Sequence, residues 1–337
     1  MSTVDLELTP SPSGPRDATP SAPRGHRLGI GDPLFRVLAT VCGITVAVAM
    51  FGLAGVLVYN SWPAITTLGT KMLTTVAWSP SQGEYGALAA LAGTALSTIV
   101  AMVIAVPLAL VIALLLVELV HPAVSRVVGT AIEMLAAIPS IVYGMVGLFV
   151  IVPYIQDHLV PWVLSTPLGN VPGIKPGLQF QGGGLSIFTA GVVLAFMVLP
   201  FITAVSRDVL KMVPQVTKEA GYGMGSTTWE VMHKISMRYA NSGIVGAVFI
   251  GLGRALGETM AVAYLIGSVY TDMPRSIFDP GTSIASLIAN QFSEATRTLD
   301  LSALIALGLI LFLITVLFQI LAQAWLSRVQ RATGGRA

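Results

Sequence analysis

Charged residues are scarce in this chain. Asp, Glu, Lys and Arg make up only 10% of the 337 residues, whereas 54% are hydrophobic and the formal net charge is +2. A soluble protein of this length normally carries a larger share of charged residues, so the composition argues against a soluble fold. The apolar residues are gathered into blocks longer than the roughly 18 residues that mark a membrane-spanning helix. The composition therefore predicts an integral membrane protein with one polytopic domain, and we expect no nucleic acid among its partners.

Cysteine and histidine are also rare, which limits the available metal and redox chemistry. The single cysteine, Cys42, lies inside the first apolar block, so the chain has neither a disulfide framework nor a thiolate metal site. The four histidines are scattered and lack the close spacing of a zinc site. They are His26, His121, His158 and His233. We expect no metal site.

Nucleotide-binding and catalytic motifs are missing as well. No G-x-x-x-x-G-K-[ST] occurs, so the chain has no P-loop to hold ATP. The spacing of three glycines, Gly251, Gly253 and Gly257, differs by one residue from the dinucleotide-binding fingerprint. They lie in an apolar block, where a G-x-x-x-G step favours close helix packing. No Ser-His-Asp arrangement, H-E-x-x-H motif or inward carboxylate pair stands out. We therefore expect no catalytic residues and no cofactor bound by this chain.

Six apolar blocks predict six transmembrane helices in an all-α fold. The blocks are Val37–Tyr59, Leu88–Leu116, Val127–Val152, Ser186–Ala204, Gly243–Gly267 and Ser302–Leu326. The Ser-, Pro- and Arg-rich opening stretch has too few large apolar residues to order itself. We expect a disordered tail at 1–33, a six-span transmembrane domain at 34–327, and a second tail at 328–337.

The distribution of Lys and Arg predicts the orientation of the spans. With the N-terminus in the cytoplasm, the inside segments hold thirteen basic residues and the outside segments hold four. Because basic residues accumulate in cytoplasmic segments, both termini are expected inside. The three outside connections, about Asn60–Ala87, Pro153–Leu185 and Ser268–Leu301, are expected to be loops. Apolar residues at helical intervals within 283–294 favour a short amphipathic helix on the outer surface.

The longest inside connection carries the most specific motif. It contains Glu219-Ala220-Gly221, then Gly225, then Ile235 ten residues later. This spacing resembles the E-A-A-x-x-x-G-x9-I-x-L-P signature in the permease subunits of ABC importers. Physically, the signature describes two short helices joined by a glycine that permits a sharp turn.

In that family the loop, at about 207–242 here, forms a coupling helix that docks on a cytoplasmic ATPase. The resemblance implies that Glu219 accepts hydrogen bonds from the ATPase and that the three small residues of the motif let it approach closely. Two departures stand out: Gly221 replaces the second alanine, and Met237-Arg238 replace the usual Leu-Pro. The alternative is a basic surface segment held by anionic membrane lipid.

Four separated pieces of sequence resemble the permeases of phosphate-specific ABC importers. They are Trp78-Ser79-Pro80 with Tyr85-Gly86-Ala87, Glu133 with Ala136–Gly144, the loop signature, and Gly253–Val262. The last piece looks like the PstC kind of permease more than its PstA sister. Glu133 itself is expected either to pair with an inner-side basic group or to contact the cargo.

The fifth apolar block contains two ionisable residues, Arg254 and Glu258, four positions apart on one helix face. A charge near the bilayer middle costs about 2.5 to 3.5 kcal/mol on insertion scales, so such residues usually mark a pathway. An arginine fork matches phosphate oxygens, while Glu258 would hold that fork or accept a proton from the anion. The alternative, compatible with the first, is a structural ion pair. Thr259 and Ser140 complete the predicted pathway, Ser140 because Pro139-Ser140 implies a helix break.

The resemblance implies an assembly around this chain. It consists of a second, PstA-like permease, a PstB-like ATPase dimer that binds ATP and Mg, and a PstS-like phosphate-binding protein outside. The permease would lie in the bacterial inner (plasma) membrane and move inorganic phosphate by alternating access. The rival hypotheses are a permease for another oxyanion (sulfate, molybdate or tungstate), an ATP-independent channel or secondary transporter, and a membrane sensor.

Overall fold

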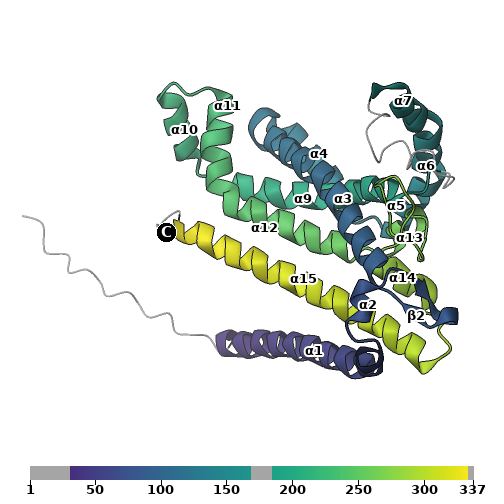
Figure 1. The fold of residues 1–337 in the computed structure, drawn as a ribbon. Helices are drawn as coiled ribbons and strands as arrows, with labels where there is room; N and C mark the ends of the chain where they lie inside the picture. Colours follow the sequence, from purple (N-terminus) through teal and green to yellow (C-terminus); the bar gives the residue numbers. More distant parts are fainter. Residues whose placement is uncertain (1–30, 168–183, 333–337) are drawn as a thin grey trace, which may run out of the picture. The chain divides into compact units, whose positions relative to one another are not determined.

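The computed structural model describes residues 31–167 and 184–332, and these residues are mostly helical (Figure 1). Residues 1–30 and 333–337 of the expected tails lie outside the described residues, whereas α1 begins at Gly31 and α15 continues to Ala332. The chain divides into two compact units, Met1–Leu53 and Ala54–Ala337, and helix α1 (Gly31–Leu68) crosses that boundary. All packing described below belongs to the second unit.

The second unit contains helices, short π-helical stretches that continue them, and one two-stranded sheet. The α-helices are α2 (Lys71–Thr74), α3 (Leu88–Leu114), α4 (Pro122–Ala136), α5 (Ser140–Val146), α6 (Val152–Tyr154), α7 (Val160–Ser165), α9 (Ile187–Lys211), α10 (Gln215–Gly223), α11 (Thr228–Glu230), α12 (Met237–Leu256), α13 (Met260–Leu265), α14 (Ile284–Gln291) and α15 (Thr298–Ala332). The π-helical stretches are η2 (Leu115–Leu119), η3 (Gly147–Ile151), η4 (Ile155–Leu159) and η6 (Val231–Ser236). Strands β1 (Trp78–Ser79) and β2 (Glu84–Tyr85) pair antiparallel across the 3-10 turn η1 (Pro80–Gln82).

Six helices among the described residues are long and apolar enough to cross a membrane, as the sequence predicts. They are Leu34–Leu68, Leu88–Leu119, Ser140–Val163, Ile187–Lys211, Thr228–Leu256 and Thr298–Arg328. Four of them overlap predicted blocks almost completely and extend beyond the C-terminal end of each. The third and fifth are shifted along the chain, because a helix break falls inside each predicted block.

The centre of the unit is the contact between α3 and α9. One face of α3 carries an alanine at every fourth position, Ala101, Ala105, Ala109 and Ala113, and all four are fully buried. Small residues at this spacing let two membrane helices approach closely, so packing replaces the hydrophobic effect that lipid does not supply. The facing side of α9 supplies large buried side chains, among them Leu194 and Ile202.

The third predicted block, Val127–Val152, is not one helix. Helix α4 ends at Ala136 and α5 begins after Pro139, because proline has no N–H to continue the hydrogen-bond ladder. The expected break at Pro139-Ser140 is therefore present. The Tyr143 hydroxyl donates to the carbonyl of Leu135 at 2.8 Å, so a side-chain hydrogen bond spans the break.

The fifth predicted block, Gly243–Gly267, is also broken. Helix α12 ends at Leu256, and α13 starts again at Met260. Gly257, the residue after α12, leaves the helical conformation at φ −92° and ψ 2°. The expectation that Arg254 and Glu258 share one face of a continuous helix is therefore wrong, since Glu258 lies in the break itself.

The outer connections are more structured than the loops that the sequence predicts. The predicted helix at 283–294 exists as α14, but it does not lie on the outer surface. Ile284 and Leu287 are fully buried against α15 and α13. In the second outer connection, described up to residue 167, helix continues through η4 and α7.

Candidate functional site

The two helix breaks meet in space. Helix α5, which begins at Ser140, packs against α13, which begins just after Thr259 (Figure 1). The approach is close: a Cβ on Gly144 would lie 3.0 Å from the Cα of Ala261. The fold therefore brings Ser140, predicted from the third block, beside the Glu258-Thr259 break, predicted from the fifth.

Arg254 lies in the last turn of α12, where its side chain is exposed. No ion pair of Arg254 occurs within residues 31–167 and 184–332, so the structural pairing with Glu258 is absent there. Glu258 is half-buried, and its Oε1 accepts from the Ala261 amide at 3.3 Å. Thr259 donates its hydroxyl to the Gly257 carbonyl at 3.4 Å. The polar side chains in the break therefore bond to nearby backbone groups. The Arg254 guanidinium remains available for other contacts.

Glu133 pairs with a basic side chain, and pairing was one of the two roles expected for it. Arg207, near the end of α9, donates from Nη2 to Glu133 Oε1 on α4 at 2.6 Å. The Arg207 side chain is buried, and it passes directly over Gly129. This bond ties α4 to α9 at the end of the bundle that carries α10.

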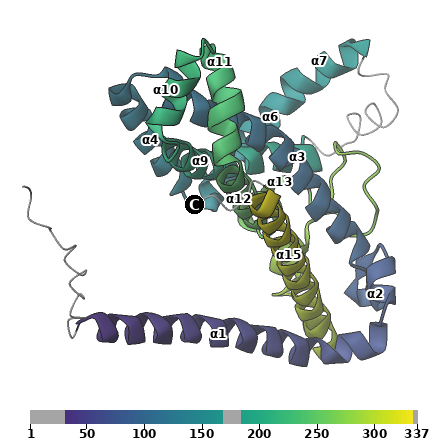
Figure 2. The ribbon, with the colours of Figure 1, turned by 90° about the vertical axis from the view of Figure 1, so that its left-hand side faces the viewer.

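Helices α10 and α11 form a projection at the end of the bundle opposite α2 (Figure 2). This projection, residues 212–236, is called the knob below. The expected glycine turn is present, since Gly225 adopts a left-handed φ of +81° that other residues rarely accept. Thr227 and Glu230 then start the second helix through a capping box.

Some of the signature residues are exposed on the knob, and one is buried within it. Glu219, Ala220 and Gly225 are exposed, as a docking surface requires. Gly221 is buried, and a Cβ there would lie 2.5 Å from Ile235. The expectation that Gly221 lets a partner approach is therefore wrong, because its small size serves packing between the knob's own two helices.

Large apolar side chains are exposed on the knob. Five large side chains project from it without cover: Met212, Val216, Tyr222, Met224 and Trp229. Exposed apolar clusters of this kind mark interaction surfaces. The exit of the knob, where Met237-Arg238 depart from the usual signature, is continuous helix from η6 into α12.

Two contacts near these sites escaped sequence reasoning. The first is Tyr143, which bridges the break in the third span. The second is Glu118 at the end of α3 and η2, which accepts bonds from Lys218 in the knob. Glu118 could have been noticed in the sequence as a lone acidic residue at the end of an apolar block. Its partner Lys218 could not, because it lies a hundred residues away.

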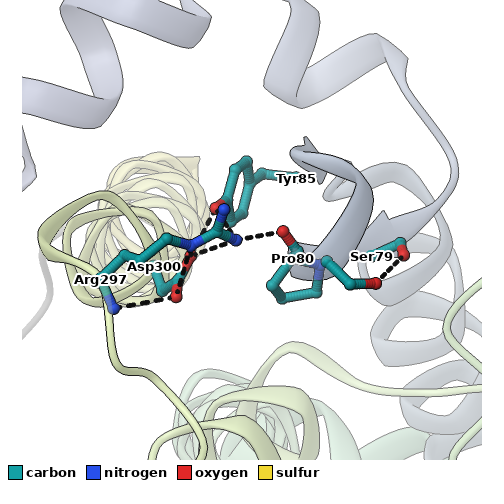
Figure 3. A network of polar contacts seen from close by, with 6 residues as sticks. Ser79, Pro80, Tyr85, Arg297 and Asp300 are labelled. Atoms are coloured by element: carbon teal, nitrogen blue, oxygen red, sulfur yellow. Dashed lines mark hydrogen bonds and ion pairs between the residues drawn. The ribbon is translucent and has the colours of Figure 1, made fainter.

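A polar network at the opposite end joins the β1–β2 hairpin to the start of α15 (Figure 3). Arg297 donates to Asp300, to the Tyr85 hydroxyl at 3.1 Å and to the Pro80 carbonyl, and Tyr85 donates to Asp300. Burial is the main cause that raises the pKa of Tyr85, and the hydrogen bond to Asp300 raises it further. The hydrogen bond to Asp300 raises the pKa of Arg297. The network holds the β1–β2 hairpin against the start of α15.

The sequence model of the family described as "Binding-protein-dependent transport system inner membrane component" matches residues 105–331, two thirds of the chain. The chain belongs to this family. The matched segment contains both helix breaks and the knob, so the transport permease domain includes all the candidate site residues. The permease is also a multi-pass membrane protein by its six apolar helices.

Curated relatives are similar over most of the permease. The phosphate transport system permease protein PstC of Pasteurella multocida is 46% identical over 301 residues, which cover 89% of this chain and 93% of the relative. The protein of the same name from Mesorhizobium japonicum is 42% identical over 334 residues, or 99% of this chain and 100% of the relative.

A solved bacterial alginate ABC transporter, in complex with an alginate-bound periplasmic protein, contains a similar chain. The TM-score is 0.55 at 12% identity, and the match covers 88% of this chain and 95% of that one. This likeness shows the fold alone. The permease therefore has the mostly helical ABC importer architecture that the sequence predicts.

Proposed function

We propose that this permease is the membrane subunit of an ATP-driven importer that moves inorganic phosphate. The similarity to PstC proteins over about nine tenths of the chain or more supports this cargo. The geometry that carries the proposal is the exposed guanidinium of Arg254 beside two broken helices. A charged donor fork in a membrane-spanning segment is costly unless it faces a polar route, and the fork matches the oxygens of phosphate.

The proposed route is lined by the residues that the two breaks bring together. Arg254 contacts the anion, and Ser140 and Thr259 supply hydroxyls from the starts of α5 and α13. Glu258, held by the Ala261 amide, accepts a hydrogen bond from a protonated phosphate oxygen. Broken helices are tolerated at membrane depth where they line a cavity, which supports placing the route here.

The knob is proposed to couple this route to an ATPase. Its exposed apolar side chains, together with Glu219, Ala220 and Gly225, form a surface for a PstB-like ATPase dimer that binds ATP and Mg. A PstA-like second permease would complete the route, and a PstS-like protein would deliver phosphate from outside. In this alternating-access cycle, ATP binding opens the route outward and hydrolysis resets it.

The proposed orientation places the knob and both chain ends on the cytoplasmic side of a bacterial inner membrane. The knob and the start of α4 lie at one end of the second unit, and the β1–β2 hairpin lies at the other (Figures 1 and 2). The basic residues concentrate on the knob's side of the spans, in keeping with the accumulation of Lys and Arg in cytoplasmic segments.

Competition of uptake tests the cargo. Cells that express the complete transporter are given labelled phosphate with an excess of unlabelled phosphate, sulfate, molybdate or tungstate. Phosphate alone is expected to suppress uptake, because only phosphate offers a protonated oxygen to Glu258 at neutral pH. Suppression by sulfate to the same degree would assign the permease to another oxyanion.

A further inference from the structure

Three elements of the permease converge on one carboxylate oxygen. Glu118 lies in η2, at the end of the second span. Its Oε1 accepts from Lys218 Nζ at 2.7 Å and from Ser236 Oγ at 2.8 Å. Lys218 belongs to α10 of the knob, and Ser236 lies where the knob continues into α12. One side chain therefore joins the second span, the knob and the fifth span.

This junction is buried. The side chains of Glu118 and Lys218 are only 6% and 9% exposed, and Ser236 is fully buried. The surrounding cluster is apolar and includes Val213 and Met232. Removing two charges from water is costly, and replacing a buried ion pair by apolar groups of similar volume is often neutral or stabilising. Stability alone therefore does not account for charges at this position.

The direction in which Lys218 points from α10 indicates what its pair with Glu118 does. Lys218 points into the protein, whereas its neighbours Glu219 and Ala220 face outward at the proposed docking surface. Another close contact of α10 is apolar, Gly221 against Ile235. Apolar contacts have no preferred direction and can slide. Charge-assisted hydrogen bonds are directional, so they fix the register between two elements.

We infer that Glu118 is a positioning residue that makes the knob move as one body with the second and fifth spans. A push on α10 by the ATPase then reaches the start of α12, and through α12 the break at Arg254. Without the Glu118 bonds, α10 yields locally while the spans remain in place. This inference rests on the proposed coupling function of the knob.

The experiment uses the complete transporter, purified with its ATPase and reconstituted into proteoliposomes. ATP hydrolysis and phosphate uptake are measured on the same vesicles. The key variant is the neutral pair Glu118→Gln with Lys218→Met, which keeps volume and leaves no unpaired buried charge. We expect it to assemble and hydrolyse ATP, with the uptake per ATP lowered at least about tenfold, as loss of one charge-assisted bond implies.

Two further variants separate positioning from simple packing. The exchange Glu118→Lys with Lys218→Glu restores an ion pair of opposite polarity, and Ser236 can accept from the new lysine, so coupling should largely return. Lys211→Met removes an exposed ion pair with Asp208 at the end of α9, outside the knob, and it should leave uptake per ATP unchanged.

Each outcome has a distinct meaning. Uptake per ATP at the wild-type value in the neutral pair would overturn the inference. Failure of that pair to assemble, with no recovery in the exchanged pair, would assign the junction to folding and also overturn it. The proposed function fails separately: if no ATPase purifies with the wild-type chain, or a bulky side chain at Ala220 leaves ATPase binding intact, the knob is not the coupling surface.

Discussion

The guanidinium of Arg207 lies directly over Gly129 while it donates to Glu133 at 2.6 Å. A Cβ at position 129 would come within 1.4 Å of Arg207 Nη1. The absence of a side chain at Gly129 is therefore what allows this ion pair to join α4 and α9. The pair in turn holds the helix that leads to the break at Pro139.

Gly129→Leu should displace Arg207 and separate it from Glu133. We expect a loss of about 1 to 3 kcal/mol in the free energy of unfolding, the usual cost of overpacking. Gly246→Leu is the matched control, because a Cβ at Gly246 meets nothing within 4 Å. Thermal unfolding of both variants in detergent checks the prediction, and equal midpoints would contradict it.

The turn of the knob should tolerate only residues that accept a left-handed backbone. At the φ of +81° of Gly225, an ordinary L-residue costs about 1 to 2 kcal/mol. Gly225→Trp should therefore combine this strain with a steric block and abolish ATPase association. Asparagine visits this conformation more easily, so Gly225→Asn should retain association. Binding of the purified ATPase to each variant measures the difference, and full association of Gly225→Trp would remove the knob from the coupling mechanism.

The orientation of the knob can be tested with impermeant thiol reagents. In a background with Cys42 replaced, single cysteines at Met224, which is 80% exposed, and at Thr296 should react from opposite sides of the membrane. Intact cells should label Thr296→Cys alone, and both should react after permeabilisation. Labelling of both positions in intact cells would contradict the proposed topology.

The outer network should be sensitive to alkaline pH. Burial raises the pKa of Tyr85 above the value near 10 of the unfolded chain, so the folded state favours the neutral phenol. The stabilisation is then complete below pH 10 and is lost as the pH rises through the higher folded pKa. Tyr85→Phe should lower the free energy of unfolding by about 1 kcal/mol. This difference from wild type should be constant from pH 7 to 9 and shrink above pH 10.

The control for this alkaline effect is Tyr59→Phe, since Tyr59 is 81% exposed. Its difference from wild type should be close to zero, because substitutions at exposed positions usually change stability little. Denaturant titrations at matched pH values measure both differences. If the difference for Tyr85→Phe did not change across pH 10, the phenol would not be the group that titrates.

Sequence patterns predicted the spans and the knob well, because both depend on local composition. Long apolar blocks specify membrane helices, and Gly225 specifies a sharp turn wherever its neighbours lie. The break at Pro139 was also readable, since proline interrupts a helix through its own covalent structure. These features need no knowledge of distant contacts.

The features that sequence patterns missed depend on tertiary packing. Gly257 lies within an apolar block, and glycine alone does not distinguish a helix break from a packing contact. Gly221 fits the docking motif in the sequence, but in the structure it packs against Ile235. The bond between Glu118 and Lys218 joins residues a hundred positions apart. The sequence around each residue does not identify its partner, even for Glu118, which stands out as an acidic residue at the end of an apolar block.

Arg254 is the residue on which the transport account depends most. Uptake of labelled phosphate by proteoliposomes that contain the complete transporter, with ATP inside, tests it directly. Arg254→Gln should lower the uptake rate at least about tenfold while ATPase association persists, since a lost bond to a charged group is worth about 1.5 to 3 kcal/mol. Arg254→Lys should be partly active, because the ammonium keeps the charge and loses the fork. Phosphate uptake at the wild-type rate by Arg254→Gln would contradict the account.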